Sequence, residues 1–428
     1  MKKQESRIHI FISLILLCVS GSYIYIIQEY DYTNKCLLGI TLLLISIHLL
    51  WKFRADRFYI LMFGIICYIN VTICFSDCIS NAVITVPPNS LSWQILRGTK
   101  YEMIYLKALC LSLSVFDVVF KQQVYIETRR LKNRDNIYCY LFGMVILVYG
   151  LLNSYTSGLN TTGEYVSDTS AIYEYCILFF LLTWYYAGKC KIRRGILLIY
   201  SGIYVLLSIL HGDRSSAFPM ILLVVLLYFP QISIKKMFFL AFAGIFASNV
   251  VSVYRNNYTL NNFFEKFMYN YGFKSVCSDT VSFSYYTGVS IAYVKDILEN
   301  TSQYFVDFLV GIIRGGSYGK ADLVTFCREY SMNRGGGMCV ANFYFWFGFA
   351  GTIVFGIILG IVCKYIQTKN TELGFIMKIY IVADVFRWYL YTSFDLFRGA
   401  FFVLPVSFLI FKILDIVTRK EMKIKLKG

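Results

Sequence analysis

The sequence predicts an all-α, polytopic integral membrane protein with about twelve transmembrane helices and a large helical extracytoplasmic loop. Three observations lead to this fold class. Of the 428 residues, 57% are hydrophobic and 15% are charged, whereas soluble domains carry about 25% charged residues. The apolar residues recur in runs of about 20, which is the length that crosses a bilayer. The mean hydropathy is +0.59, and the chain contains only five prolines.

Each apolar run is expected to form one membrane-spanning helix. A basic start followed by a long apolar run favours a retained first helix over a cleaved signal peptide. The runs 36–51 and 217–231 are short for a span. The predicted spans are 8–28, 36–51, 58–78, 101–120, 136–153, 171–188, 195–210, 217–231, 237–254, 338–363, 373–391 and 399–417. They divide the chain into a nine-helix membrane region at 1–254, a long loop at 255–337, and a three-helix membrane region with a basic tail at 338–428.

Basic residues gather on one side of this predicted arrangement. With the N-terminus placed inside, the inner segments hold 24 of the 41 lysines and arginines, and the short outer loops hold five. The positive-inside rule assigns the richer side to the cytoplasm. The net charge of +16 is therefore interpreted as topology rather than as nucleic-acid binding, and both termini are predicted to be cytoplasmic.

The outer segment 255–337 contains no apolar run that would span the membrane. Aromatic and aliphatic residues recur at helical spacing around 263–271 and 304–313, which predicts two amphipathic helices on the outer membrane surface. Eight basic and seven acidic residues nearly cancel in this segment, so individual arginines matter more than bulk charge. A connection of this length is usually functional or disordered.

Charged residues in short outer turns are the first candidates for a functional site. His211, Asp213 and Arg214 share one turn between two apolar runs, and charge at the membrane boundary indicates function by default. Arg314 and Arg334 each precede glycines, and a forked cation beside open backbone N–H groups suits a phosphate. A hairpin turn with a local Asp213–Arg214 pair, and ordinary solvated glycine turns, remain the structural alternatives.

Other chemistries lack the residues that they need. The chain has three histidines, so a His-rich metal site is excluded, and it has neither a glycine-rich nucleotide loop nor a GxSxG elbow. Neither a metal nor a cofactor is expected. Arg398 lies in the last short outer loop, where a structural pair with Asp395 is the alternative to a functional role.

A glycine cluster followed by an aromatic helix, RGGGMCVANFYFWFGFAG at 334–351, resembles the C-terminal region of Wzy-type O-antigen and capsule repeat-unit polymerases. The turn 212–215 resembles the Gly-x-Arg turn of that family, and the long loop that opens at Tyr254 fits the same plan. Asn342 departs from the pattern, because many members carry an acid there. This departure argues against a catalytic carboxylate at that position.

The resemblance implies a GT-C-like glycosyltransferase of the bacterial inner (cytoplasmic) membrane. Such an enzyme joins oligosaccharide repeat units carried on undecaprenyl diphosphate at the extracytoplasmic face, without a metal. The implied partners are the undecaprenyl-diphosphate-linked oligosaccharide, membrane lipid and a chain-length regulator protein, with no nucleic acid. A lipid-linked oligosaccharide flippase and an O-antigen ligase remain as alternatives.

In such an enzyme, cations at the membrane surface would stabilise the diphosphate leaving group in place of a metal. The residues expected to act in catalysis are Arg214, Asp213, His211, Arg314 and Glu329. The residues expected to bind substrate are Arg255, Arg334, Arg398, Tyr271 and Tyr318. The base that takes the acceptor proton is left open among His211, Asp213, Glu329 and, in addition, Asp322.

Overall fold

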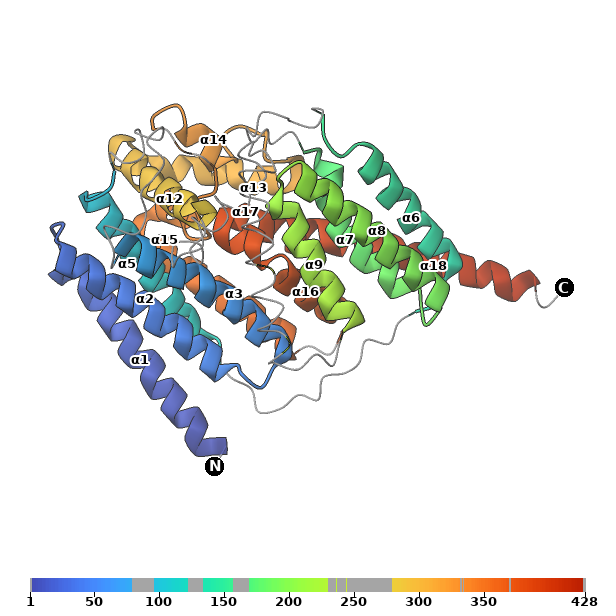
Figure 1. The fold of residues 1–428 in the computed structure, drawn as a ribbon, viewed down its shortest axis with the longest axis horizontal. Coiled ribbons are helices and arrows are strands. Elements are labelled where there is room, and N and C mark those ends of the chain that lie inside the picture. Colours follow the sequence, from blue (N-terminus) through green and yellow to red (C-terminus); the bar gives the residue numbers. More distant parts are fainter. Residues whose placement is uncertain are drawn as a thin grey trace, which may run out of the picture. The chain divides into compact units, whose positions relative to one another are not determined.

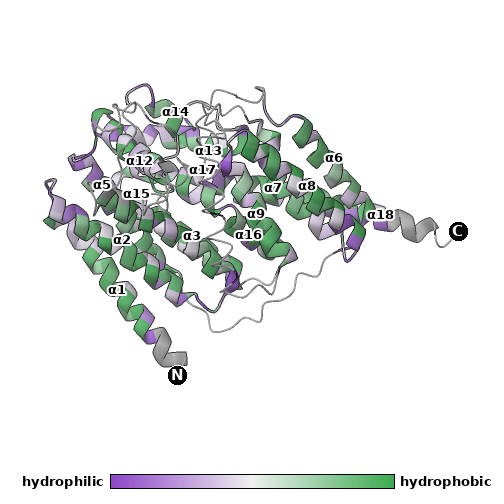
Figure 2. Cartoon of the chain, in the orientation of Figure 1, coloured by the Kyte–Doolittle hydropathy of each residue, from purple (hydrophilic) through white to green (hydrophobic). Residues whose placement is uncertain are grey.

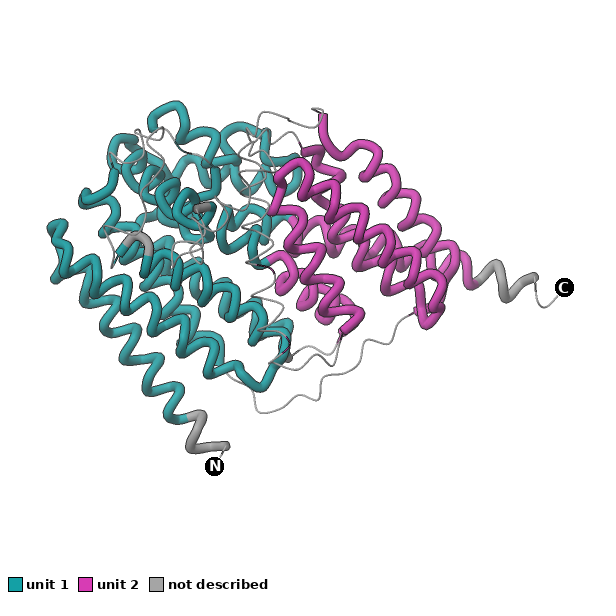
Figure 3. The backbone as a smooth tube through the Cα atoms, in the orientation of Figure 1, with its two compact units in different colours: residues 1–128, 276–370, 385–398 teal, residues 129–275, 371–384, 399–428 magenta. Residues whose placement is uncertain are grey.

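A computed structural model describes residues 2–78, 96–121, 134–156, 169–229, 236, 244, 279–331, 333, 335–368 and 371–425. Throughout these ranges the regular secondary structure is helical, and no strand is present in them. The chain divides into two compact units (Figure 3). Unit 1 comprises residues 1–128, 276–370 and 385–398, and unit 2 comprises residues 129–275, 371–384 and 399–428.

Unit 1 is organised around helix α5. Its helices are α1 Lys2–Ile26, α2 Tyr32–Lys52, α3 Arg57–Ile73 continued by the π-helix η1 Cys74–Cys78, α5 Lys100–Val119, α12 Asp279–Ile297, the 3-10 helix η3 Thr301–Gln303, α13 Tyr304–Arg314, α14 Leu323–Cys327, α15 Ala341–Thr368, the π-helix η4 Phe386–Tyr391 and α17 Ser393–Asp395. Helices α1, α2, α12 and α15 all pack against α5 (Figure 1). A Cβ at Gly356 of α15 would lie 2.5 Å from the Ser112 carbonyl oxygen, so glycine permits the close approach of α15 to α5.

Unit 2 is a second helical bundle. Its helices are α6 Ile137–Leu152, α7 Ala171–Tyr186, α8 Lys191–Leu210, α9 Arg214–Tyr228, α16 Glu372–Ala383 and α18 Leu404–Lys425. The π-helix η5 Leu396–Val403, whose first three residues belong to unit 1, leads into α18. Helices α6 and α7 approach closely because Gly143 and Gly150 lie against the side chains of Thr183 and Cys176. Small residues at such contacts are typical of helix packing in membranes.

Five helices within the described ranges are long and apolar enough to cross a membrane, namely Arg7–Ile26, Tyr32–Lys52, Lys191–Leu210, Ala341–Gln367 and Ser393–Arg419. Four shorter apolar helices, Arg57–Ile73, Ile137–Leu152, Ala171–Tyr186 and Arg214–Tyr228, coincide with further predicted spans. These helices confirm the helical membrane class but not the predicted number of spans. Three predicted runs contain a π-helical segment at one end, and 237–254 lies, apart from Gly244, outside the described residues.

Helix α8 shows why these helices suit a bilayer. Apolar side chains recur along its exposed face every three or four residues. They are Ile192, Ile196, Ile199, Ile203, Leu206 and Leu210, each at least 41% exposed. A continuous apolar stripe of this length would be unfavourable in water and is favourable against lipid. Figure 2 shows hydrophobic residues along the helices and hydrophilic residues near their ends.

Helix ends that the charge pattern assigns to one side also meet within each unit. In unit 1, Lys52 at the end of α2 pairs with Asp117 at the end of α5, both on the predicted inner side. At the predicted outer side, Lys100 pairs with Asp296. The contacts are therefore consistent with the predicted alternation of the helices, whereas which side is cytoplasmic rests on the charge distribution.

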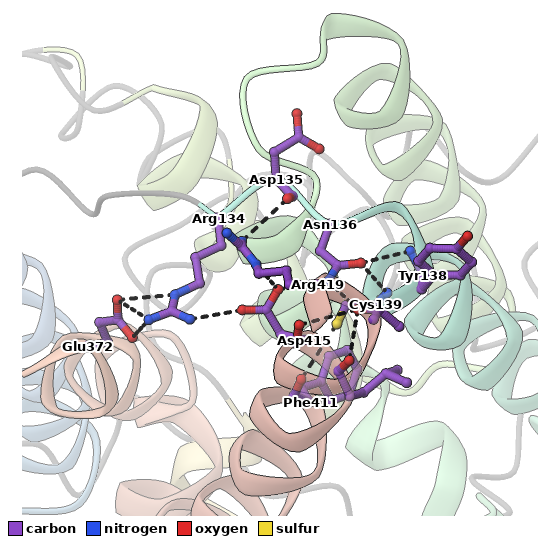
Figure 4. Close-up of polar contacts among 11 residues, drawn as sticks. Arg134, Asp135, Asn136, Tyr138, Cys139, Glu372, Phe411, Asp415 and Arg419 are labelled. Carbon is purple, nitrogen blue, oxygen red and sulfur yellow. Dashed lines mark hydrogen bonds and ion pairs between the residues drawn. The ribbon is translucent and has the colours of Figure 1, made fainter. Parts of the chain in front are cut away.

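In unit 2, the predicted inner ends are joined by Arg134, which lies between Glu372 and Asp415 (Figure 4). Arg134 contacts Glu372 at 3.1 Å and Asp415 at 2.8 Å. Asp415 is almost fully buried and also accepts a hydrogen bond of 2.7 Å from Asn136 and one of 2.6 Å from Arg419. These bonds connect the beginnings of α6 and α16 to the second half of α18.

The long outer segment contains a helix that the sequence analysis missed. Helix α12 is 19 residues long and largely buried against α5 and α15. Its serines, threonines and tyrosines lower its hydropathy, so it lacks the apolar run by which spans are recognised. Helix α13 confirms the predicted amphipathic helix at 304–313, whereas the one predicted at 263–271 lies outside the described residues.

Candidate functional site

In unit 1, the C-terminal end of α13 is held in place by aromatic rings. Phe308, which is 1% exposed, lies within 4.6 Å of the Trp346 ring centroid and 5.6 Å of the Phe394 ring centroid. Phe394 also packs on Gly311 and Gly316, at 3.4 Å and 3.6 Å from the positions that a Cβ would occupy. This packing places the segment 393–398 directly beside the end of α13.

At this point Arg398 lies against Gly315, the residue that follows Arg314. Arg314 is the last residue of α13, and Gly315 follows with φ +122°, a conformation that favours glycine. Nη1 of Arg398 lies 2.9 Å from the position of a Cβ on Gly315, so any larger residue would displace the guanidinium group. The Arg314 guanidinium carbon lies 5.3 Å from the centroid of the Tyr318 ring. Three residues predicted to act on substrate are thus brought together.

Arg314 and Arg398 can stabilise the end of α13 as well as bind an anion. Cations near the C-terminus of a helix interact favourably with its dipole, by about 0.3–1 kcal/mol each. Two arginines beside one glycine also provide forked donors for the oxygens of a phosphate group. Because the end of α13 carries partial negative charge, a bound anion would depend on the guanidinium groups of Arg314 and Arg398 rather than on the helix.

In unit 2, the turn between α8 and α9 contains the other predicted cluster. Asp213 is 2% exposed and caps α9 by accepting hydrogen bonds from the Ser216 N–H at 3.1 Å and the Ser215 hydroxyl at 2.5 Å. Gly212 has φ +69°, which allows this tight turn. Arg214 opens α9, where a positive charge opposes the helix dipole, and the buried Asp213 carboxylate offsets it.

The third member of this turn, His211, has a defined tautomer. Its Nδ1 lies 2.9 Å from the Leu207 carbonyl oxygen, which can only accept, so Nδ1 carries the hydrogen. In the neutral ring, Nε2 is then free to accept a proton. The ring stacks on Tyr155, with centroids 3.8 Å apart and planes 5° from parallel. His211 is therefore better placed than the capping residue Asp213 to act as a base.

Tyr155 was not predicted from the sequence. Its hydroxyl group donates to Asp213 Oδ2 at 3.3 Å while its ring covers His211, so it connects both predicted residues. Burial, followed by the Asp213 charge, raises the pKa of Tyr155, which keeps the hydroxyl protonated as a donor. The only sequence signal was its position just after an apolar run.

The remaining predicted residues are not part of either cluster. Asp322 caps α14 through Thr325, and Asn342 accepts a hydrogen bond from Thr392 at 3.0 Å. Glu329 is exposed and, within the described residues, forms no ion pair or hydrogen bond with Arg314 or Arg398. Three further predicted residues lie outside the described residues. They are Arg255, Tyr271 and Arg334.

Unit 1 also contains four connected ionisable side chains that the sequence analysis did not single out. We call Lys52, Asp117, His48 and His9 the inner array. They are each at most 5% exposed and lie at the predicted inner ends of α1, α2 and α5. Ionisable residues inside membrane helices indicate function by default, which was the available signal.

A scan against protein-family models finds no match to this chain, and neither do searches of the curated proteins and of the solved structures.

Proposed function

We propose that this protein is a membrane glycosyltransferase of the Wzy type, which joins undecaprenyl-diphosphate-linked oligosaccharide repeat units at the extracytoplasmic face. The observation that carries the proposal is the position of Arg398 against Gly315, the residue after Arg314, whose own guanidinium group lies near the Tyr318 ring. Arg398 is distant in the chain from Arg314 and Tyr318, and all three residues lie on the predicted outer side. A lipid diphosphate would have its phosphates at that level of the membrane.

The proposed reaction is a glycosyl transfer. A hydroxyl oxygen of the incoming unit attacks the anomeric carbon of the growing chain, and the bond between that carbon and the diphosphate oxygen breaks. Undecaprenyl diphosphate leaves with the bonding electrons. Arg314 and Arg398 would stabilise the charge that develops on it, and each such donor is worth about 3–4 kcal/mol in comparable sites.

The hydroxyl proton must move to a base during the attack. Within unit 2, the candidate for a base is His211, because its own hydrogen bond leaves Nε2 as the accepting nitrogen. Asp213 and Asp322 are engaged as helix caps, which makes them poorer bases. The assignment of His211 rests on the turn in unit 2 alone and is tested separately from that of the arginines.

The test is a deletion strain complemented with single variants. We expect the deletion to leave surface glycan with one repeat unit, wild type to restore long chains, and Arg314→Ala and Arg398→Ala to fail. The matched control is Arg328→Ala, because Arg328 is another exposed outer arginine, which contacts Asn333 instead. Full chain length in both Arg314→Ala and Arg398→Ala would show that the arginine assignment is wrong.

The same strain separates the alternatives. Lipid-linked units that accumulate inside the cell would identify a flippase, and complete polymer that stays on its lipid carrier would identify a ligase. The flippase remains the second candidate because of the inner array, since proton-coupled transporters use connected ionisable residues within their spans.

A further inference from the structure

The inner array is a continuous hydrogen-bonded chain across three helices of unit 1. Lys52 Nζ on α2 lies 2.8 Å from Asp117 Oδ1 on α5 and also donates to the Asp117 backbone carbonyl. His48 Nδ1 on α2 lies 2.8 Å from Asp117 Oδ2, and His48 Nε2 lies 3.2 Å from His9 Nδ1 on α1. Two of the three histidines of the protein are therefore in one contact.

The positions of the hydrogens follow from the partners. An ionised carboxylate can only accept, so His48 Nδ1 donates to Asp117, and in the neutral ring His48 Nε2 accepts from His9 Nδ1. Two ring nitrogens in contact share one hydrogen, so the histidine pair cannot be doubly charged while the contact lasts. The nitrogen that remains for an incoming proton is Nε2 of His9.

An aromatic ring and several basic residues lie near the inner array. The ring of Trp51 lies edge-on to His9, with centroids 4.5 Å apart, and is itself partly exposed. The nearby charges are Arg54 after α2, which acts on His9, and Lys121 after α5, which acts on Lys52. Arg7 on α1 is exposed. Among the side chains that the structure describes, Asp117 is the one carboxylate that bonds to the other members of the array.

We propose that the inner array is a binding site for a single proton, which enters at His9 and comes to rest on His48 beside Asp117. When a proton binds His9 Nε2, His9 passes its Nδ1 hydrogen to His48 Nε2. His48 then carries both ring hydrogens and one positive charge, while His9 is neutral with its hydrogen on Nε2. The array gains one proton and one charge, and no other group is consumed.

The electrostatics of the site make two opposite predictions. The Asp117 carboxylate is 2.8 Å from His48 and stabilises the imidazolium, whereas Lys52, bound to the same carboxylate, opposes it. A charge in such proximity shifts a titration midpoint by about 1–3 pH units. Asp117→Asn should therefore lower the midpoint of proton uptake, and Lys52→Met should raise it. This inference does not depend on the proposed glycosyl transfer.

The test is a titration of full-length protein in lipid nanodiscs, labelled with carbon-13 at histidine Cε1. Three histidines give three signals, which His211→Gln and His48→Gln assign. We expect His9 and His48 to titrate together and take up one proton between them. His211, which lies in unit 2, gives the third signal.

The matched control is Lys107→Met. Lys107 is buried like Lys52 but lies on α5, where it donates to the Ile27 carbonyl oxygen. It lies about 15 Å along the helix from Asp117. It should leave the midpoint unchanged. The proposal is overturned if His9 and His48 each take up a proton independently, or if Lys52→Met shifts the midpoint no more than Lys107→Met. Should Asp117→Asn fail to fold, these two results still decide.

Discussion

Removal of Lys35 tests how unit 1 tolerates charge in its interior. Lys35 Nζ lies 2.7 Å from Glu102 Oε1, and both side chains are 0% exposed. Glu102 also accepts a hydrogen bond of 3.0 Å from the Gly98 N–H and one of 3.4 Å from the Tyr286 hydroxyl. Lys35→Met would leave the carboxylate buried with, among the described residues, only these two neutral donors.

The expected change in the free energy of unfolding follows from the full burial of both side chains. Breaking a buried ion pair by removing one partner costs about 3–5 kcal/mol, because the other charge stays desolvated. Replacing both partners by apolar residues of similar volume is often neutral or stabilising. We therefore expect Lys35→Met to lower the free energy of unfolding by about 3–5 kcal/mol, and Lys35→Met with Glu102→Leu to recover most of that loss.

The assay is the free energy of unfolding in detergent for the two single variants and the double variant. Lys100→Met is the matched control, since Lys100 pairs with Asp296 at a similar 2.9 Å but both side chains are more than half exposed. Screening by water should make its effect small. The reasoning is refuted if Lys35→Met costs no more than Lys100→Met, or if the double variant is less stable than either single variant.

Two further variants address unit 2. Arg134→Ala removes the hydrogen bonds that join the almost fully buried Asp415 to Glu372. We therefore expect the free energy of unfolding to fall by about 2 kcal/mol. The control is Arg193→Ala, which should cost less because its partner, the Asp135 carboxylate, is exposed. Equal losses would contradict this account. Tyr155→Leu removes the ring stacked on His211 and should reduce glycan polymerisation about tenfold to a hundredfold, whereas Tyr155→Phe keeps the ring and should retain most of it. Normal chain length in Tyr155→Leu would exclude a positioning role.

Several helices and one feature of the site could be predicted from the sequence. The runs of apolar residues predicted α1, α2, α8 and most of the other helices, and the helical spacing of apolar residues predicted α13. Asp213 precedes the first residue of α9, where an aspartate is the expected cap, so its structural role was also readable. Its charge at the membrane boundary had favoured a functional role over this capping role.

The sequence by itself determined the helical membrane class and predicted the alternation of the helices, because both depend on local properties: hydropathy along each run and the charge between runs. The tertiary structure alone decided which side chains meet. It brought Arg398 to Gly315 beside Arg314, stacked Tyr155 on His211, and joined His9 to Asp117 through His48. These partners are far apart in the chain, and their proximity depends on how whole helices pack, which no local pattern encodes.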